Sequence, residues 1–389
     1  MQPRLNAPDR LMDENGRLRD WLALIRAPDL GATRIRSLLD KFGNPRSIRS
    51  AEAGALARHG LGAASIDALQ QPDERRIDAD LAWLDEAGAS MLAWDDEDYP
   101  PQLRAIDRPP PVLFVLGDPA VLWLPQLAIV GSRNATRGGL ENARAFSRSL
   151  TRAGLVVTSG LALGVDGMAH RAALDAGGYT VAVAATGLDR VYPARHRELA
   201  REIVARGAIV SEFPPGVEPR AGHFPARNRI IAGLSVGTLV VEAGVTSGSL
   251  ITARLAMEQN RDVFAIPGSI HNPLAKGCHR LIKDGAKLVE TGEDLLGELD
   301  VAVRRQIDVG RSRLEMAADE AAEPVSQVRD PEYAKLLDAM GFDPVTLDQL
   351  VESTGLTVEA VSSMLLILEL DGMVESGPGG RYCRIGEVG

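Results

Sequence analysis

The chain has 389 residues, of which 45% are hydrophobic and 25% charged, and its formal net charge is −10. This composition is typical of a globular protein with two or three domains, and the acidic balance excludes a basic surface over the whole chain. Any site for a polyanion must therefore be local. Two cysteines and six scattered histidines exclude a disulfide scaffold and offer no metal-ligand pair. No apolar run is long enough to cross a bilayer, so we expect a cytoplasmic protein.

Short helical patterns fill the first part of the chain. Residues 1–17 are polar and are expected to fray, and a helix is expected over 18–27. Further short helices joined by glycine turns continue to residue 69 and resemble helix-hairpin-helix or SAM-like modules. Modules of this kind either dock against other domains or touch DNA backbones, and docking is favoured. We predict an N-terminal helical, SAM-like domain over 1–85.

The middle of the chain alternates between apolar runs and helical patterns. Continuous apolar strands with helix-length crossovers predict a doubly wound, mostly parallel sheet covered on both faces. This is a Rossmann-like α/β domain over 86–300, which binds ligands at the carboxyl ends of its strands. The expected strands are 91–94, 112–116, 127–130, 155–158, 180–184, 208–211, 237–241, 263–266 and 287–289, with helices over 139–153, 165–176, 196–206 and 249–259.

The last part of the chain predicts a linker and a small separate module. Residues 301–330 are rich in Ala, Glu, Asp and Arg without apolar periodicity, which is typical of a flexible linker. Three helices and a hairpin then predict a winged-helix domain over 331–389, with Thr346 as a helix cap and Gly355 in a turn. The presumed recognition helix, over 357–370, carries acidic side chains and neither Lys nor Arg. This favours a protein-interaction module over a DNA reader.

The stretch LAIVGSRNATRGG contains a glycine turn after a strand. Gly131, Ser132 and Arg133 follow the apolar run, and a glycine pair then opens a helix. Such a turn is either a phosphate cradle with an arginine fork, or a tight turn with a solvent-exposed arginine. The motif is neither G-x-G-x-x-G nor a Walker loop, so no nucleotide cofactor is expected.

Several further loops are expected at the same sheet edge, of which two contain charged side chains in informative positions. In SGLALGVDGMAH, Gly160 permits close backbone approach, and Asp166 and His170 lie four residues apart. That pair suits either acid–base chemistry or a hydrogen bond that holds the loop, and the second interpretation is favoured. In FPARNRIIAGLS, Arg227 and Arg229 flank an amide where a helix is expected to start, which suits phosphate better than a solvated helix start.

The order of these motifs resembles the DNA-processing protein A (DprA/Smf) family. The motifs are VGSR, SGLALGVDGMAH, GLDRVYP, SEFPPG, FPARNRIIAGLS, VVEAGVTSGSLITARLA, VFAIPGS and LIKDGA, spread over residues 100–297. The resemblance implies a cytosolic protein that binds single-stranded DNA in natural transformation, protects it and loads the RecA recombinase onto it. It also implies a homodimer through the Rossmann-like domain, SAM-like and winged-helix flanking domains, and no catalytic activity.

The family pattern also implies site residues. Arg133 matches the arginine that grips a DNA phosphate, with Gly131 and Ser132 as backbone donors, and Arg195 is a looser match after YP. Phe224 and Tyr192 lie within these motifs and are the best stacking platforms in a chain with 4% aromatic residues. The predicted DNA-binding set is Gly131, Ser132, Arg133, Gly160, Arg195, Phe224, Arg227, Asn228, Arg229, Ser247 and Ser249.

An enzyme is the competing interpretation. Related Rossmann-like folds hydrolyse nucleotide N-glycosidic bonds, and Glu242, at the end of a strand, could serve as the acid. The sequence there reads VEAGVTSGS rather than the PGGxGTxxE-like pattern expected for that chemistry. Binding of single-stranded DNA without catalysis is therefore the favoured expectation.

Overall fold

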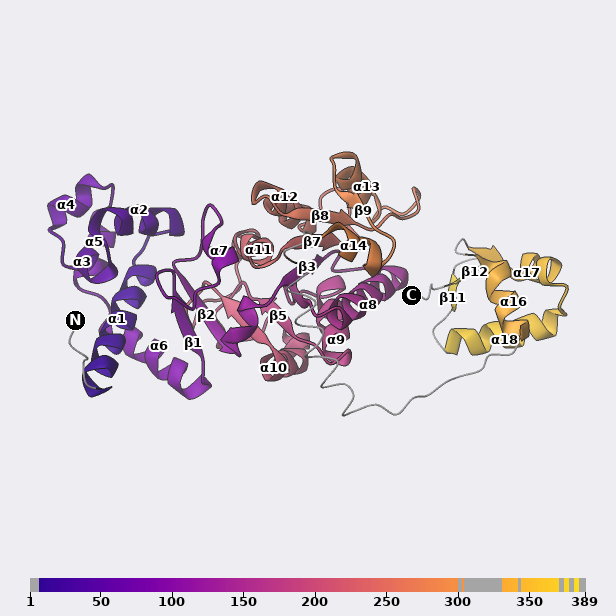
Figure 1. The fold of residues 1–389 in the computed structure, drawn as a ribbon, viewed down its shortest axis with the longest axis horizontal. Helices are drawn as coiled ribbons and strands as arrows, with labels where there is room; N and C mark the ends of the chain where they lie inside the picture. Colours follow the sequence, from indigo (N-terminus) through magenta and orange to yellow (C-terminus); the bar gives the residue numbers. More distant parts are fainter. Residues whose placement is uncertain are drawn as a thin grey trace.

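The computed structural model describes residues 7–299, 303, 331–341, 344–370, 374–377 and 381–384. The first part is helical (Figure 1) and consists of α1 (Ala7–Arg26), α2 (Ala32–Phe42), α3 (Pro45–Arg49), α4 (Ala53–Arg58), α5 (Ala63–Gln70) and α6 (Glu74–Ala87). Helix α1 starts at Ala7, so the expectation of fraying is wrong for residues 7–17, whereas residues 1–6 lie outside the described residues. Ion pairs from Arg17 to Asp95 at 2.7 Å and from Arg19 to Glu74 at 2.9 Å anchor its polar part.

The next part of the chain forms a nine-stranded sheet in the order β1-β2-β6-β5-β4-β3-β7-β8-β9. Strand β1 pairs antiparallel with β2, and β2 pairs antiparallel with β6, whereas all other neighbours are parallel. The chain runs outward from β3 to β6 and then returns to β7 on the other side of β3. The direction of winding reverses between β3 and β7, which is the topological switch point of a doubly wound sheet. The strands are β1 (Ser90–Ala93), β2 (Val112–Gly117), β3 (Gln126–Val130), β4 (Val156–Ser159), β5 (Thr180–Val183), β6 (Ala208–Ser211), β7 (Gly237–Val240), β8 (Asp262–Ala265) and β9 (Lys287–Leu288).

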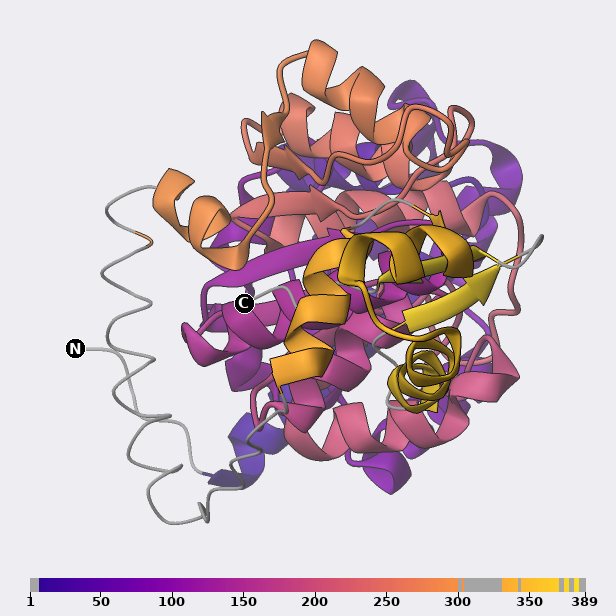
Figure 2. The ribbon, with the colours of Figure 1, turned by 90° about the vertical axis from the view of Figure 1, so that its right-hand side faces the viewer.

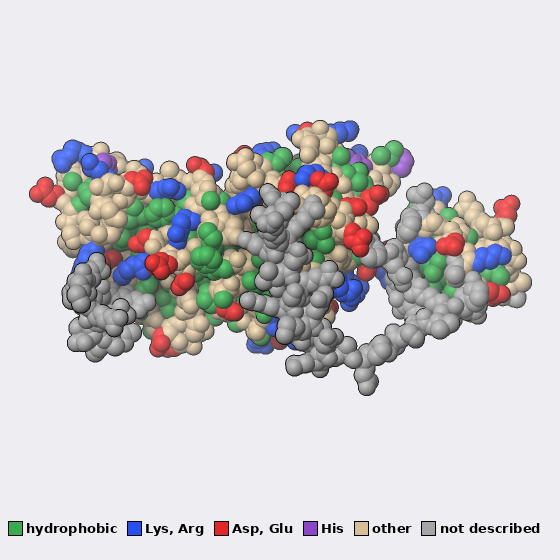
Figure 3. All heavy atoms as spheres, in the orientation of Figure 1, with side chains coloured by type: hydrophobic (Ala, Val, Ile, Leu, Met, Phe, Trp, Pro, Cys, Tyr) green, Lys and Arg blue, Asp and Glu red, His purple; other side chains and the backbone are tan. Residues whose placement is uncertain are grey.

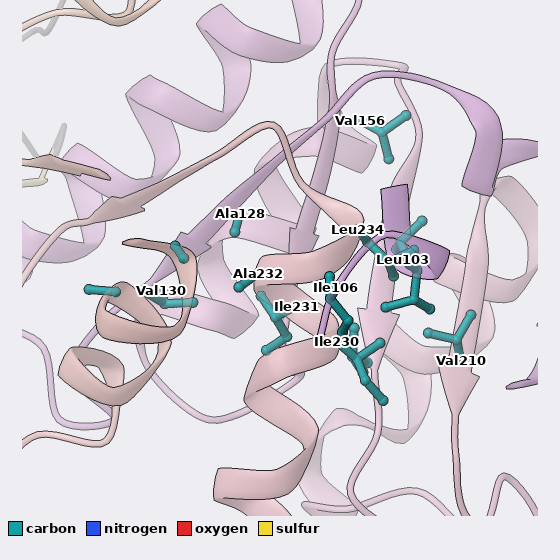
Figure 4. Packing of buried hydrophobic residues seen from close by; sticks show 14 of the residues in the cluster. Leu103, Ile106, Ala128, Val130, Val156, Val210, Ile230, Ile231, Ala232 and Leu234 are labelled. Carbon is teal, nitrogen blue, oxygen red and sulfur yellow. The ribbon is translucent and has the colours of Figure 1, made fainter. Parts of the chain in front are cut away.

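Helices cover both faces of this sheet, as the continuous apolar strands predict. One face carries α7 (Pro101–Arg104), α11 (His223–Leu234), α12 (Ser249–Glu258) and α13 (Lys276–Lys283); the other carries α8 (Arg137–Arg152), α9 (Val165–Asp175), α10 (Arg197–Arg206) and α14 (Gly292–Glu298). In Figure 2 the orange α13 lies above the strands, and the magenta helices lie below them. Alternate residues of β3 point to opposite faces, with Ala128 and Val130 packed towards α11 (Figure 4) and Ile129 towards α8. The predicted α/β fold class is confirmed.

The N-terminal helices and the sheet share one hydrophobic cluster. Trp21 of α1 and Ile77 of α6 belong to the same buried group as Phe114 of β2. Polar contacts reinforce this packing, because Arg26 and Arg76 both donate to the Pro215 carbonyl, at 3.0 and 3.2 Å. Arg26 also pairs with the buried Asp80. These contacts fix the helices against the sheet.

The last described part is a small helical module with a three-stranded sheet. It comprises α16 (Pro331–Met340), β10 (Val345–Thr346), α17 (Leu347–Thr354), α18 (Val358–Leu370), β11 (Val374–Gly377) and β12 (Arg381–Arg384), with strand order β10-β12-β11. Thr346 forms a capping box with Gln349, and Gly355 ends α17 at a φ of 66°. The predicted winged helix is confirmed, whereas the expected linker lies outside the described residues apart from residue 303. Within the described ranges, no helix has both the length and the hydropathy that a membrane span requires.

Candidate functional site

A pocket of about 210 Å³ opens at the switch point of the sheet. Its walls come from the end of β3, the loop after β4, the first turns of α11 and the start of α12. This is the edge at which doubly wound sheets bind ligands. The lining residues are Val130, Gly131, Arg133, Ala162, Asp166, Phe224, Pro225, Arg227, Asn228, Ile231, Ser247, Gly248, Ser249, Ile251 and Thr252.

Arg133 lies exposed at the mouth of the pocket. Its guanidinium carbon is 5.3 Å from the centre of the Phe224 ring. The Phe224 ring in turn lies 5.7 Å from the ring of Tyr192, which is 48% exposed. No acidic side chain in the described ranges pairs with Arg133. A cation and two aromatic faces are therefore available to a ligand at the same place.

Arg227 contributes a second, buried cation. Only 4% of the residue is exposed, and its Nη1 donates to the Val183 carbonyl. Its Nε has no partner among the described residues, and no carboxylate there lies within ion-pair distance. Burial lowers the pKa of Arg227 to about 10, with Asp166 opposing this shift and Arg133 adding to it. A buried charge without a direct counter-ion favours an anionic ligand.

Asp166 holds the loop that forms one wall of the pocket. Its Oδ2 accepts hydrogen bonds from the backbone N–H groups of Gly160, at 3.1 Å, and Ala162, at 3.4 Å. Burial raises the pKa of Asp166, and the nearby Arg227 opposes this shift. His170 points elsewhere, since its Nδ1 lies 2.7 Å from Thr180 Oγ1. The favoured interpretation, a carboxylate that holds the loop, is confirmed.

Close contacts with neighbouring atoms require glycine at two positions of the predicted set. A Cβ at position 160 would lie 2.1 Å from Arg227 Nη1, and one at position 131 would lie 2.6 Å from Val165 Cγ2. The glycines therefore allow the loops after β3 and β4 to pack directly against α9 and α11.

The start of α12 forms the opposite wall. The hydroxyls of Ser247 and Ser249 lie 2.7 Å apart, and Asn228 Nδ2 donates to the Gly248 carbonyl at 3.4 Å. The N-cap residue Gly248 has no side chain, and the Ser249 N–H donates to the Ser247 hydroxyl at 3.3 Å. The N-terminal end of α12, where the helix dipole is positive, lies at the pocket. Thr252, one turn further along α12, also lines the pocket and was not in the predicted set. Its spacing of three residues from Ser249 is the signal that could have identified it.

Glu242 has a structural role at the start of α8. Its Oε2 accepts from the Thr136 N–H at 2.9 Å, and its Oε1 accepts from the Thr136 hydroxyl at 2.7 Å. Thr136 in turn caps α8 by accepting from Gly139 N. These bonds account for both oxygens of the side chain suggested as an enzymatic acid. Helix α8 begins at Arg137, so Gly131–Arg133 does not form its N-terminus.

Four predicted residues lie outside the pocket lining, namely Gly160, described above, and Ser132, Arg195 and Arg229. Ser132 is buried, and its hydroxyl accepts from Asn134 N at 3.2 Å, while Arg195 is exposed on η2 (Ala194–His196). Arg229 forms an ion pair with Glu212 at 2.5 Å. Burial raises the pKa of Glu212, and Arg229 opposes that shift.

The expected helix start at 227–229 is wrong, because α11 begins at His223. Arg227 and Arg229 therefore lie in the second turn and point to different sides of the helix. The side chain of Arg227 reaches the pocket. The helix dipole at the N-terminal end of α11 does not add to its positive charge there.

A metal site finds no support in the described ranges, where no group of three His, Cys, Asp or Glu side chains is placed to hold an ion. Two further histidines, His196 and His279, have backbone partners. His196 Nδ1 lies 2.9 Å from the Leu161 carbonyl, and His279 Nε2 lies 2.9 Å from the Gly268 carbonyl.

Comparison with known proteins places this site in a family context. Residues 90–300 match the family of DNA recombination-mediator protein A, and residues 320–380 match the DprA winged helix domain. The chain is 41% identical over 335 residues to Protein Smf of Escherichia coli, covering 86% of this chain and 87% of that one. It is 48% identical over 205 residues to DNA processing protein DprA of Streptococcus pneumoniae, covering 53% and 72%.

Two solved structures are similar as well. The crystal structure of DprA from Streptococcus pneumoniae matches with a TM-score of 0.66 and 38% identity, covering 72% of this chain and 98% of that chain. A structure of DNA processing protein A from Helicobacter pylori, described for its single-stranded DNA binding mode, matches with a TM-score of 0.50 and 30% identity, covering 55% and 97%. The chain belongs to the DNA recombination-mediator protein A family, the family of the DprA and Smf proteins.

Proposed function

We propose that the protein binds single-stranded DNA in the pocket at the β3–β7 switch point. The observation that carries this proposal is the exposed, unpaired Arg133 over the Phe224 ring, at the mouth of a pocket that also holds the buried Arg227. Arginines bind phosphates, and an aromatic face stacks on any base. The site therefore suits a strand recognised through its backbone and base faces, without reading of its sequence.

The overall charge supports a local site of this kind. With a net charge of −10, the protein as a whole repels nucleic acid. Arg133, Arg227 and the N-terminal end of α12 concentrate positive potential at one place. The Helicobacter pylori relative, described for its binding of single-stranded DNA, supports the same ligand for this chain.

Family membership supports a finer proposal. The protein protects incoming single strands in natural transformation and loads the RecA recombinase onto them, as a cytoplasmic homodimer without catalytic activity. The helical part over 1–85, the sheet domain over 86–300, a linker over 301–330 and the winged helix over 331–389 are the proposed domains. Arg195 and Arg229 belong to the proposed DNA surface, outside the pocket itself.

The test is a salt titration of oligonucleotide binding by the Arg133→Ala variant. Loss of one phosphate contact lowers the slope of log K against log[salt] by ~0.7 for a single strand. The loss of affinity should be similar for oligonucleotides of different sequence, because a phosphate contact carries no sequence information. Arg148→Ala, an exposed residue of α8 outside the pocket lining, is the control for the same change in charge. Unchanged affinity and slope in Arg133→Ala would overturn the proposal.

A further inference from the structure

We propose that a second groove, between α2 and α11, binds the continuation of the single strand beyond the Arg133 pocket. This inference rests on the proposed function and adds the N-terminal helices to the DNA surface. The groove has a volume of about 790 Å³. Its lining residues are Asp29, Gly31, Ala32, Thr33, Arg34, Arg108, Glu212, Phe213, His223, Ala226 and Arg229.

Helix α11 separates the two hollows and contributes to both. His223, Ala226 and Arg229 recur every three residues and line the groove, whereas Phe224 and Arg227 line the pocket. Residues at this spacing share one helix face. A helix with its side chains is about 10 Å across. A strand that leaves the pocket across the first turns of α11 therefore reaches the groove within a few nucleotides.

The groove offers two cations that are available to phosphates. Arg34 is exposed, and its Nη1 donates to the Asp29 carbonyl at 3.0 Å, which leaves its other N–H donors without a partner in the described part of the chain. Arg108 is exposed and has only a 3.7 Å contact with its neighbour Asp107, whose side chain is 95% exposed. Arg229 and Glu212 neutralise each other. Asp29 is the remaining lining carboxylate, so the groove carries a net positive charge.

The groove also contains a stacked ring pair. The rings of Phe213 and His223 lie 4.2 Å apart with an interplanar angle of 23°, and both residues are partly exposed. Stacked faces of this kind accept a base at the end of the stack. Cations beside an aromatic stack are the same chemistry as Arg133 beside Phe224 and Tyr192. The remaining wall is short or polar and has no aliphatic hollow that would anchor a protein ligand.

The groove is already formed in this structure. The Pro215 carbonyl, close to Phe213 in sequence, accepts bonds from both Arg26 and Arg76. The N-terminal helices and β2 share one buried cluster. A strand can therefore bind there without ordering of the protein, and the cost of binding is mostly that of ordering the DNA.

The test compares a short and a long oligothymidylate, of about 6 and about 20 nucleotides, in salt titrations of the full chain. In Arg34→Ala/Arg108→Ala, affinity for the long strand should fall about tenfold. The salt slope for the long strand should fall by ~1.4, at ~0.7 for each contact. Binding of the short strand, which the Arg133 pocket holds, should not change. Charge-retaining Arg34→Lys/Arg108→Lys should keep most of the slope.

Two further variants sharpen the result. Arg46→Ala/Arg58→Ala removes the same charge from exposed sites of α3 and α4, on a part of the molecule where Lys and Arg gather (Figure 3), and should leave both oligonucleotides unaffected. Asp29→Asn removes the opposing carboxylate at a residue with a φ of 58°, which Asn also tolerates, and should tighten long-strand binding alone.

The outcomes separate this inference from the proposed function. If the Arg34/Arg108 double variant binds the long strand like the unmodified protein, or no worse than the Arg46/Arg58 control, the groove is not a DNA site. The proposal for the Arg133 pocket is tested separately, because loss of short-strand binding in Arg133→Ala supports it independently. If neither oligonucleotide responds to Arg133→Ala, the proposed function itself fails.

Discussion

The guanidinium of Arg227 occupies the space that a side chain at position 160 would need, with 2.1 Å between Nη1 and the position of a Cβ. Gly160 also donates its N–H to Asp166, so the same residue lies against both the buried guanidinium of the pocket and the carboxylate near it. The absence of a side chain at position 160 therefore sets where the buried charge lies in the pocket.

Substitution Gly160→Ala tests this relationship. The added methyl group must displace Arg227 from the Val183 carbonyl, and overpacking of this kind costs about 1–3 kcal/mol of folding stability. We also expect weaker binding of single-stranded DNA, measured by fluorescence anisotropy, beside a urea unfolding curve. Gly138→Ala is the control, because the nearest atom to its Cβ lies 3.8 Å away and alanine favours a helix. Equal DNA affinity in Gly160→Ala would show that the position of Arg227 is unimportant.

Phe224→Leu separates stacking from charge. Leucine keeps an apolar side chain at the mouth of the pocket but removes the ring between Arg133 and Tyr192. Loss of one base stack weakens binding by about 1–3 kcal/mol, while the number of phosphate contacts stays the same. Affinity should therefore fall without a change in the salt slope, the opposite signature from Arg133→Ala. A lower slope in Phe224→Leu would mean that the ring acts by positioning Arg133.

His170 gives the fold a defined dependence on pH. Burial lowers its pKa to about 3 from 6.5, with His196 and Arg227 adding to the shift. Thr180 donates its hydroxyl to the Val157 carbonyl and so accepts from His170 Nδ1, which leaves Nε2 unprotonated. Between pH 6.5 and 3 the unfolded chain binds the extra proton, so this group lowers stability as the pH falls, by at most about 1.4 kcal/mol per pH unit.

The measurement is urea unfolding across that pH window for the protein and for His170→Gln. Glutamine can still donate to Thr180 but does not titrate, so the variant should show a flatter loss of stability towards low pH. Parallel curves for the two proteins would assign the acid sensitivity to other groups.

Glu242→Gln distinguishes a structural carboxylate from a catalytic one. The amide can still accept one bond from Thr136 but not both, so the start of α8 should lose about 1–2 kcal/mol of stability. Binding of single-stranded DNA should stay within the error of the assay. Incubation of the unmodified protein with nucleoside monophosphates should release no free base; base release that disappears in Glu242→Gln would establish the enzymatic alternative.

Removal of residues 331–389 tests the role of the winged helix. The helix α18 stretch carries acidic side chains and neither Lys nor Arg, so we expect the truncated chain to keep its affinity for single-stranded DNA in a mobility shift. The truncation should instead weaken a protein–protein contact, measured as binding of RecA or of a second copy of the chain. A large loss of duplex binding after truncation would make the winged helix a DNA reader.

The sheet was predictable because its strands are buried on both faces. The β3 and β6 segments are continuous apolar runs, and their bounds in the structure differ from the expected ones by at most one residue. The position of the pocket mouth was also predictable from the sequence, since loops after parallel strands meet at one edge of the sheet. The placement of Arg133 over the Phe224 ring was not predictable, because it depends on how far α11 extends towards that edge.

The errors arise from contacts between distant parts of the chain. Pro225 lies inside the first turn of α11, where proline is tolerated, so the helix begins at His223 rather than at the arginines. Glu212, at the end of β6, neutralises Arg229, and no local sequence pattern predicts that ion pair. Polar residues before Leu18 continue α1, where Asp95 and Asp96, far along the sequence, provide partners for Arg17.

The bonds from Arg26 and Arg76 to the Pro215 carbonyl have a consequence for the kinetics of binding. The N-terminal helices also share one buried cluster with β2, so the α2 wall of the groove is held against the sheet and does not swing open to admit a strand or close over it afterwards. Association should then be a single step whose observed rate rises linearly with DNA concentration and falls steeply with salt. The residence time of the DNA on the protein would depend on how many nucleotides must dissociate together.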